Sequence, residues 1–565
     1  MSKPHRKLLA FNKIYQELNQ KYGFKEANEI CEAVWNYSVY LHDFDTSTFY
    51  SYCFAYDIKD IVEKGLFFID GYNAQAPKHL DSFVQILMEA VAWLSRRQSG
   101  AVGLPNLIPY MYYFWSRDVA QGYYTKDPET YKYQNIQALI YRLNQPWVRQ
   151  DQCAFTNVSV FDHPYFEAIF GGTEFPDGSF MIDEEEEIIE FQKDFIQVIN
   201  DIREANVFTF PVLTASLLYQ NDKFVDEDFA KWACEASRKW NIFNFFTDSS
   251  VNSLSNCCRL KSDIRDLYFN SIGGTALKVG SVKVSTLNLA RLAYQNKTEK
   301  EFLVALRDLV VKNLKLLDII RTIIKRNVEK GLLPNFSFGL IDFPHLYNTC
   351  GVNGIYEVMK TFGYTSVDEL GNTYYDEQAY NFGQEIFKVI HNTIADFALD
   401  KDYKINIEQA PAEQAAVKML KADELLYPDD VVEDLPLYGN QWIPLGINAT
   451  LQERTKICAA FDSYCNGGSI QHINIENTFV NFEQAWHMLN WVAQQGVTYF
   501  AFNSKVAQCE NFHSFYGEIC PICSKKKIAE YSRTVGFYTA VKYWSKERQA
   551  EYEMRKWDNV NKISN

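Results

Sequence analysis

Segments with the apolar spacing of helices and segments with that of strands follow one another along this chain, and no linker separates them. Helical spacing occurs over residues 1 to about 40, 79–98, 301–329 and 376–399, and strand spacing over 154–160 and 284–289. Both kinds of element must bury their apolar faces against a partner. We therefore expect most of the 565 residues to form one large α/β domain.

The composition predicts a cytoplasmic protein that binds neither membranes nor nucleic acids. No stretch of about 18 or more apolar residues occurs, and the basic start Met1–Lys7 leads into a polar helical pattern. The formal net charge is −15 and no long run of Lys or Arg occurs, so the clustered cations that bind nucleic acid backbones are missing. The negative net charge does not exclude a small ligand that carries phosphate, because helix N-termini bind phosphate. The twelve cysteines are then metal ligands, redox groups or packing residues.

Four residues near the carboxyl end have the spacing of a closed metal site. Cys509 and His513 are followed by the pair Cys520 and Cys523. Two residues between cysteines let both thiolates reach one ion from a tight turn, and three sulfurs with one nitrogen favour a structural zinc. The first half, with three intervening residues and a histidine, is the less typical part. The alternative is four unrelated residues.

A glycine follows this predicted zinc ribbon within the segment Arg533–Tyr538. Gly536 stands between Val535 and Phe537, which is compatible with an ordinary tight turn. The other interpretation is chemical. A glycine Cα radical can lie planar and delocalise into both adjoining peptide groups, and a side chain would hinder that planarity.

A zinc ribbon followed by Arg-Thr-Val-Gly-Phe-Tyr resembles the carboxyl-terminal signature of anaerobic (class III) ribonucleoside-triphosphate reductases. Other matching segments, in chain order, are Leu41–Asp45 with Cys53, Ser95–Gly100, Gln152–Asn157, Asn256–Leu260, Gly280–Ser281 with Thr286–Leu289, Cys350–Glu357 and Glu408–Glu413. The resemblance implies the ten-stranded α/β barrel with a central finger loop that ribonucleotide reductases share with pyruvate formate-lyase. We expect the barrel over 1–498, and a zinc-ribbon and glycyl-radical domain over 499–565.

The same resemblance implies a radical mechanism that begins at Gly536. A finger-loop cysteine would become a thiyl radical; Cys258, directly before an arginine, is the better candidate and Cys257 the fallback. The thiyl would abstract the 3′-hydrogen of the ribose, water would leave from C2′, and Cys53 would supply hydrogen there. The chain lacks the three-cysteine motif of radical S-adenosylmethionine enzymes, so a separate iron–sulfur activase must install the radical.

The reductant is predicted from a departure from the family pattern. Many relatives use formate and carry a methionine two positions before the radical cysteine, where this chain has Asn256, or Ser255 if Cys257 is the radical residue. We hypothesise a disulfide between Cys53 and Cys350 after each turnover, reduced by a thioredoxin- or glutaredoxin-like protein. Formate is the alternative reductant, and packing is the alternative role of Cys350.

Substrate contacts also follow from the resemblance. Ser281, Asn157 and Glu408 match positions near the nucleotide, although each is as compatible with a structural role. The implied substrate is a ribonucleoside triphosphate and the implied assembly a homodimer, with ATP or dNTP effectors at sites that the sequence does not locate.

Two other functions compete with this reductase: another glycyl-radical enzyme of the pyruvate formate-lyase type, and a non-catalytic zinc-ribbon protein. The latter should show a basic face, and Lys525–Lys527 is the only basic cluster near the ribbon.

Overall fold

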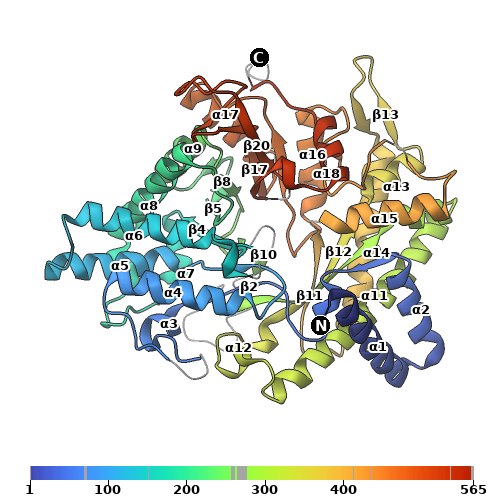
Figure 1. Cartoon of the computed structure of the whole chain (residues 1–565). Helices are drawn as coiled ribbons and strands as arrows, with labels where there is room; N and C mark the ends of the chain where they lie inside the picture. Colours follow the sequence, from blue (N-terminus) through green and yellow to red (C-terminus); the bar gives the residue numbers. More distant parts are fainter. Residues whose placement is uncertain are drawn as a thin grey trace.

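The computed structural model describes residues 2–68, 73–149, 152–255, 261–263, 277–410, 413–432, 434–534 and 536–560. A single eleven-stranded sheet forms its centre. Ten of the strands follow one another in the order β15, β12, β11, β2, β3, β4, β5, β8, β17 and β16. Helices surround the outside of this sheet, on the left and on the right in Figure 1.

The sheet consists of two parallel halves. One half contains β2 (Phe54–Ala55), β3 (Val102–Gly103), β4 (Thr156–Phe161), β5 (Val212–Ser216) and β8 (Phe243–Phe246). The other contains β11 (Val279–Asn288), β12 (Leu346–Asn353), β15 (Ile405–Gln409), β16 (Gln471–Asn474) and β17 (Tyr499–Asn503). Most of these strands are buried on both faces, as parallel strands covered by helices are.

Three contacts close the two halves into a barrel. β2 pairs antiparallel with β11 at Phe54 and Gly280, and β8 pairs antiparallel with β17. A parallel bridge from Glu408 of β15 to Gly468, just before β16, closes the remaining gap. The predicted ten-stranded α/β barrel is thereby confirmed, with β1 (Val39–Leu41) as an added strand on β11.

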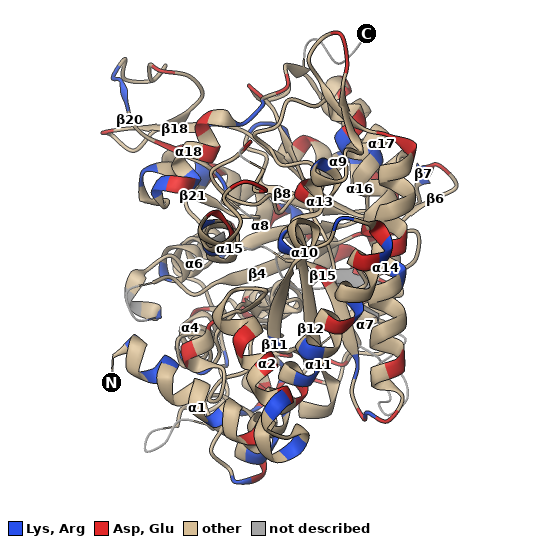
Figure 2. Cartoon of the chain, turned by 90° about the vertical axis from the view of Figure 1, so that its right-hand side faces the viewer, with Lys and Arg blue, Asp and Glu red and all other residues tan. Residues whose placement is uncertain are grey.

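The outer helices include the predicted helical segments 79–98, 301–329 and 376–399, together with helices outside the predicted segments. α11 (Glu299–Glu329) and α14 (Glu377–Ala398) cover the half that contains β11 and β12, whereas α4 (Leu80–Ser95), α5 (Leu107–Gln121), α6 (Pro128–Leu143) and α8 (Glu185–Ala205) cover the other half (Figure 1). Lys and Arg are interspersed with Asp and Glu along α11, whereas α14 has three acidic residues and one lysine (Figure 2). Among the described residues, no helix is long and apolar enough to cross a membrane.

The carboxyl-terminal ribbon has a small sheet of its own. Its strands are β18 (Val506–Cys509), β19 (Ser514–Phe515), β20 (Lys527–Arg533) and β21 (Tyr538–Ala540). Tyr499–Asn503 is β17 of the barrel, so the ribbon sheet begins at Val506 and not at the expected residue 499. The predicted finger loop falls between β8 and β11, where the described part is the hairpin of β9 (Ser253–Ser255) and β10 (Lys261–Asp263). Cys257 and Cys258 lie outside the described residues.

Candidate active site

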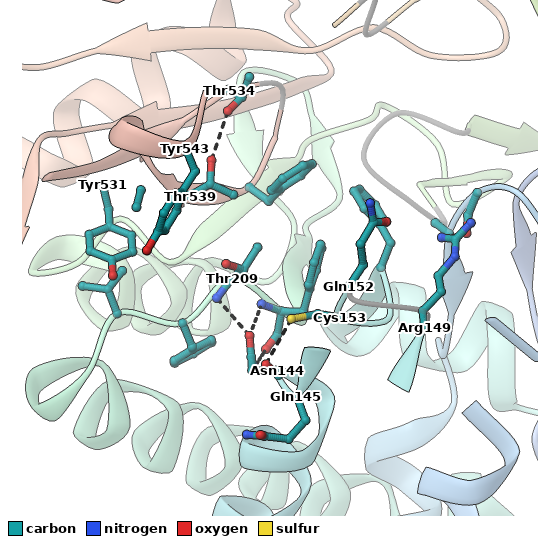
Figure 3. Close-up of a pocket in the computed structure, with 18 of the residues that line it drawn as sticks. Asn144, Gln145, Arg149, Gln152, Cys153, Thr209, Tyr531, Thr534, Thr539 and Tyr543 are labelled. Carbon is teal, nitrogen blue, oxygen red and sulfur yellow. Dashed lines mark hydrogen bonds between the residues drawn. The ribbon is translucent and has the colours of Figure 1, made fainter. Parts of the chain in front are cut away.

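One cavity of about 1570 Å³ lies between the barrel and the carboxyl-terminal segment. Its wall contains three of the predicted site residues, Cys53, Ser281 and Glu408, together with Phe537, the neighbour of Gly536. Figure 3 shows part of the wall, where Tyr531, Thr539 and Tyr543 of the carboxyl-terminal segment lie across the cavity from Thr209 and from Asn144 at the end of an outer helix. The cavity therefore brings the predicted reducing cysteine and the predicted radical loop to one space.

Cys53 is held between two glycines. A Cβ on Gly100 would lie 2.3 Å from Sγ of Cys53, and one on Gly280 would lie 2.1 Å from its carbonyl oxygen. The thiol accepts a hydrogen bond from the backbone N–H of Ala101 at 3.2 Å. Any side chain at either glycine would therefore displace the cysteine.

Arg149 holds the Gly100 segment from the other side. Its guanidinium donates to the carbonyl oxygens of Gln98, Ser99 and Gly100, at 3.1, 2.5 and 3.2 Å. Burial lowers the pKa of Arg149 from its usual value. Sequence reasoning missed this residue, because its three acceptors are backbone groups some fifty positions away.

The predicted disulfide between Cys53 and Cys350 does not fit this barrel. Cys53 lies opposite Ser281 of β11, which pairs with Tyr347 of β12, so two strand spacings of about 4.8 Å already separate the Cys53 backbone from β12. A disulfide needs Cα atoms within about 7 Å of each other. Cys350 lies three residues beyond Tyr347 on β12.

Cys350 also faces away from the cavity. Its Sγ accepts a hydrogen bond at 3.3 Å from Nδ2 of Asn313 in the outer helix α11, and it is not among the residues that line the cavity. Full burial raises the pKa of this thiol to about 12, which keeps it protonated and unreactive. The alternative role of Cys350, packing, is the one that this position favours.

The three predicted substrate contacts occupy two different places. Ser281 and Glu408 line the cavity, and the Ser281 hydroxyl lies 3.0 Å from the hydroxyl of Thr349. Asn157 is buried in β4, does not line the cavity, and donates to Oγ1 of Thr214 at 3.2 Å. Ser281 and Glu408 thus have access to a ligand in the cavity, whereas Asn157 belongs to a polar network inside the barrel.

Two ionisable groups at β11 have lowered pKa values. Burial lowers the pKa of His42 to about 3, and its Nε2 lies 2.8 Å from Oγ1 of Thr286. Burial also lowers the pKa of Lys283 to about 8, and its Nζ donates to the carbonyl oxygen of Asp43 at 3.2 Å. His42 is therefore neutral at physiological pH, whereas Lys283 titrates just above it.

Gly536 lies in the turn between β20 and β21. It is buried and has a φ of 135°, a conformation that residues with a side chain rarely adopt. Its carbonyl oxygen accepts hydrogen bonds from Nη1 of Arg533 at 2.7 Å and from Nδ2 of Asn244 at 3.5 Å. The turn therefore accounts for a glycine at this position, and this conformation is also compatible with a radical on its Cα.

Phe537 fixes the glycine loop to the barrel. Its ring centroid lies 4.9 Å from that of Phe155 and 5.4 Å from that of Phe210. Phe155 directly precedes β4, and the peptide bond between Phe210 and Pro211 before β5 is cis. Each such aromatic pair contributes about 0.5–1.5 kcal/mol beyond area burial.

The four predicted metal ligands come together in the ribbon. Their ligand atoms all lie within 4.8 Å of one another, with Sγ of Cys509 and Cys523 3.6 Å apart and Sγ of Cys520 3.5 Å from Nδ1 of His513. Tetrahedral zinc with bonds of about 2.3 Å to sulfur and about 2.0 Å to nitrogen requires sulfur–sulfur and sulfur–nitrogen separations of about 3.8 and about 3.5 Å. A disulfide of about 2.05 Å does not match the sulfur pair. The residues therefore fit zinc.

The comparisons with known proteins agree with this geometry. The family model for anaerobic ribonucleoside-triphosphate reductase matches residues 3–557. A solved anaerobic ribonucleotide reductase is 38% identical with a TM-score of 0.92, and the match covers 99% of this chain and 89% of that one. The anaerobic ribonucleotide reductase from Thermotoga maritima in complex with dATP and CTP is 38% identical with a TM-score of 0.90, over 97% and 90% of the two chains.

A more distant structure shows the fold alone. Hydroxyproline dehydratase from Clostridioides difficile is 13% identical with a TM-score of 0.51, over 87% of this chain and 69% of that one. No curated protein matches the chain.

Proposed function

Because this chain belongs to the anaerobic ribonucleoside-triphosphate reductase family, we propose that its cavity is the site of ribonucleotide reduction and that Gly536 stores the radical. The observation that carries the residue assignment is the shared cavity. Cys53 and Phe537 both line it, and Gly536 is buried directly beside Phe537. Once it is installed, this radical would provide the means to abstract a hydrogen atom.

Cys53 is proposed as the hydrogen donor to C2′ of the ribose. Gly100, Gly280 and the N–H of Ala101 fix its position, so the thiol meets a bound nucleotide with little reorganisation. The closed barrel keeps water and stray hydrogen donors from the reacting atoms. Cys258, with Cys257 as the fallback, is proposed as the residue that attacks the ribose.

The nucleotide is proposed to lie along the β11 and β15 side of the cavity. Ser281 and Glu408 face the cavity there, and Gln414 and Ala415 of α15 (Glu413–Leu426) line it as well. Backbone N–H groups in the first turn of a helix bind phosphate, which supports a triphosphate near this end of α15. Glu408 would then contact the sugar and not the phosphates, because like charges repel.

The ribbon is proposed to bind one structural zinc through Cys509, His513, Cys520 and Cys523. The four-ligand set leaves no open position for catalysis, which is the property of a structural site. The proposed partners are a radical S-adenosylmethionine activase and a second copy of this chain, and the proposed location is the cytoplasm. ATP or dNTP effectors are proposed by analogy with the relative that binds dATP.

The electrons for each turnover are proposed to come from a thioredoxin- or glutaredoxin-like protein, with formate as the second candidate. The absence of a methionine two positions before the radical cysteine favours the redoxin. Cys350 faces Asn313 of α11 and not the cavity, so it is not proposed to form a disulfide with Cys53. A different thiol would have to take that part.

Product formation tests these assignments. Anaerobically activated, zinc-replete protein should convert CTP to dCTP with one of the two reductants. Cys53→Ser should abolish multiple turnover with either, and Cys350→Ser, the matched control, should retain it. A Cys53→Ser protein that turns over repeatedly would contradict the role of Cys53. Activity with formate and none with a redoxin would overturn the redoxin proposal alone.

A further inference from the structure

Arg533 is a fully buried cation whose partners are neutral. Nη1 donates to the Gly536 carbonyl oxygen at 2.7 Å and to Oδ1 of Asn244 at 2.6 Å, and Nη2 donates to the carbonyl oxygen of Asn241 at 2.7 Å. Its exposed fraction is 2%. Within the described ranges, no carboxylate forms an ion pair with it.

Burying this cation without a carboxylate has a free-energy cost. Burial lowers the pKa of Arg533 because a charge without a counter-ion is poorly solvated in the interior. The turn already has a backbone hydrogen bond, at 3.4 Å, from the N–H of Thr534 to the carbonyl oxygen of Phe537. The ring of Tyr538, whose centroid lies 4.8 Å from the guanidinium carbon of Arg533, offsets part of this cost. Arg149, which is half-buried, and Arg454, which is buried, also donate to backbone carbonyl oxygens. The feature particular to Arg533 is therefore that one of its acceptors is the carbonyl oxygen of Gly536.

Asn244 and its neighbours fix the donors in place. Nδ2 of Asn244 donates to the hydroxyl of Tyr499 at 3.0 Å, and that hydroxyl lies 3.2 Å from Oγ1 of Thr214. Asn157 in turn donates to Thr214. These four side chains come from β8, β17, β5 and β4, so the barrel itself orients the hydrogen bonds to Gly536.

The chemistry of a glycine radical makes the acceptor important. When Cα has lost a hydrogen atom, its unpaired electron spreads into the adjoining N–H and carbonyl groups. Electron density moves from the nitrogen towards the carbonyl oxygen, and a cation hydrogen-bonded to that oxygen stabilises this form. The closed-shell glycine gains less from the same bond, because its oxygen carries less charge.

We propose that Arg533, oriented by Asn244, is a positioning residue that stabilises the radical on Gly536 by polarising its carbonyl group. This inference rests on the proposed assignment of the radical to Gly536. The hydrogen atom leaves Cα for the adenosyl radical of the activase, and no proton moves to or from Arg533. Asn244 belongs to the barrel, so a loop withdrawn from the barrel would lose the part of this orientation that Asn244 supplies.

Electron paramagnetic resonance of the activated full-length protein tests the proposal. Arg533→Lys keeps a cation but loses the fixed geometry, so spin density should return to Cα and the splitting from the α-hydrogen should widen. The radical should also decay about tenfold faster without substrate, which corresponds to about 1.4 kcal/mol, part of a charge-assisted hydrogen bond. Arg203→Lys is the matched control. Arg203 is buried too, its guanidinium carbon lies 5.4 Å from the centroid of the same Tyr538 ring that Arg533 faces, and within the described residues it bonds no atom of Gly536.

A second measurement needs no substitution. Protein labelled with nitrogen-15 in its arginine side chains should show a nitrogen coupling to the radical by electron–nuclear double resonance. The absence of that coupling overturns the inference, even if Arg533→Lys fails to fold or to be activated.

The possible outcomes separate the inference from the proposed function. An unchanged splitting and decay rate in Arg533→Lys overturns the inference and leaves Gly536 as the radical residue. A signal that survives in Gly536→Ala overturns both. A widened splitting in Arg533→Lys but not in Arg203→Lys, together with the nitrogen coupling, supports the inference.

Discussion

Gly100→Ala is predicted to slow turnover strongly without removing the radical. The added Cβ would lie 2.3 Å from Sγ of Cys53 and 3.0 Å from the carbonyl oxygen of Tyr52. Since such atoms rest about 3.5 Å or more apart, the thiol must move by about 1 Å. Overpacking of this kind costs about 1–3 kcal/mol of stability, and a misplacement of about 1 Å costs about 100-fold in rate.

The assay counts radicals and product in the same sample. Gly100→Ala should give the spin count of the unsubstituted protein and about 100-fold less dCTP. Gly363→Ala is the control, because its Cβ meets no atom within 4 Å while its φ of 78° imposes strain. It should lose stability and keep its turnover. A turnover of Gly100→Ala within about twofold of that of the control would refute the claim that the position of Cys53 limits the reaction.

Three further predictions concern the loop, the ribbon and the buried lysine. Phe537→Ala loses both aromatic contacts of the loop, so hydrogen exchange at 534–538 should quicken by about tenfold or more; unchanged exchange would contradict this. Cys520→Ser should lose zinc, which elemental analysis detects, and should expose residues 506–533 to proteolysis because structural zinc contributes about 10 kcal/mol or more; an ordered, zinc-free ribbon would disprove it. The pKa of Lys283 falls from 10.5 to about 8 on folding, so the unfolded state binds more protons between these values and stability rises with pH there. The difference in free energy of unfolding between Lys283→Met and the unsubstituted protein, measured with denaturant, should therefore shift by about 2 kcal/mol in favour of the unsubstituted protein from about pH 8 to about pH 9.5. A difference that stays constant over this range would refute the lowered pKa.

Local patterns predicted the parts of the structure that depend on neighbours in the chain. The zinc ligands Cys520 and Cys523 are close in sequence, and the helical spacing over 301–329 is strong enough to place α11 within two residues. The barrel followed from the order of the family segments and not from their periodicity. Its strands are buried on both faces, so they do not alternate.

The same lack of alternation hides the direction in which Cys350 faces. Both Thr349 and Gly351 beside it are buried, so nothing in the sequence tells which face of β12 each side chain occupies. The role of Arg533 was hidden for another reason. Its anchor Asn244 lies 289 positions away, a separation that only the closed barrel bridges.

The most direct test of the central claim is the electron paramagnetic resonance spectrum of the zinc-replete protein after anaerobic activation with S-adenosylmethionine, a reductant and its activase. The account predicts a doublet from one α-hydrogen that disappears in Gly536→Ala. The absence of a doublet with a demonstrably competent activase, or a doublet that persists in Gly536→Ala, would contradict it.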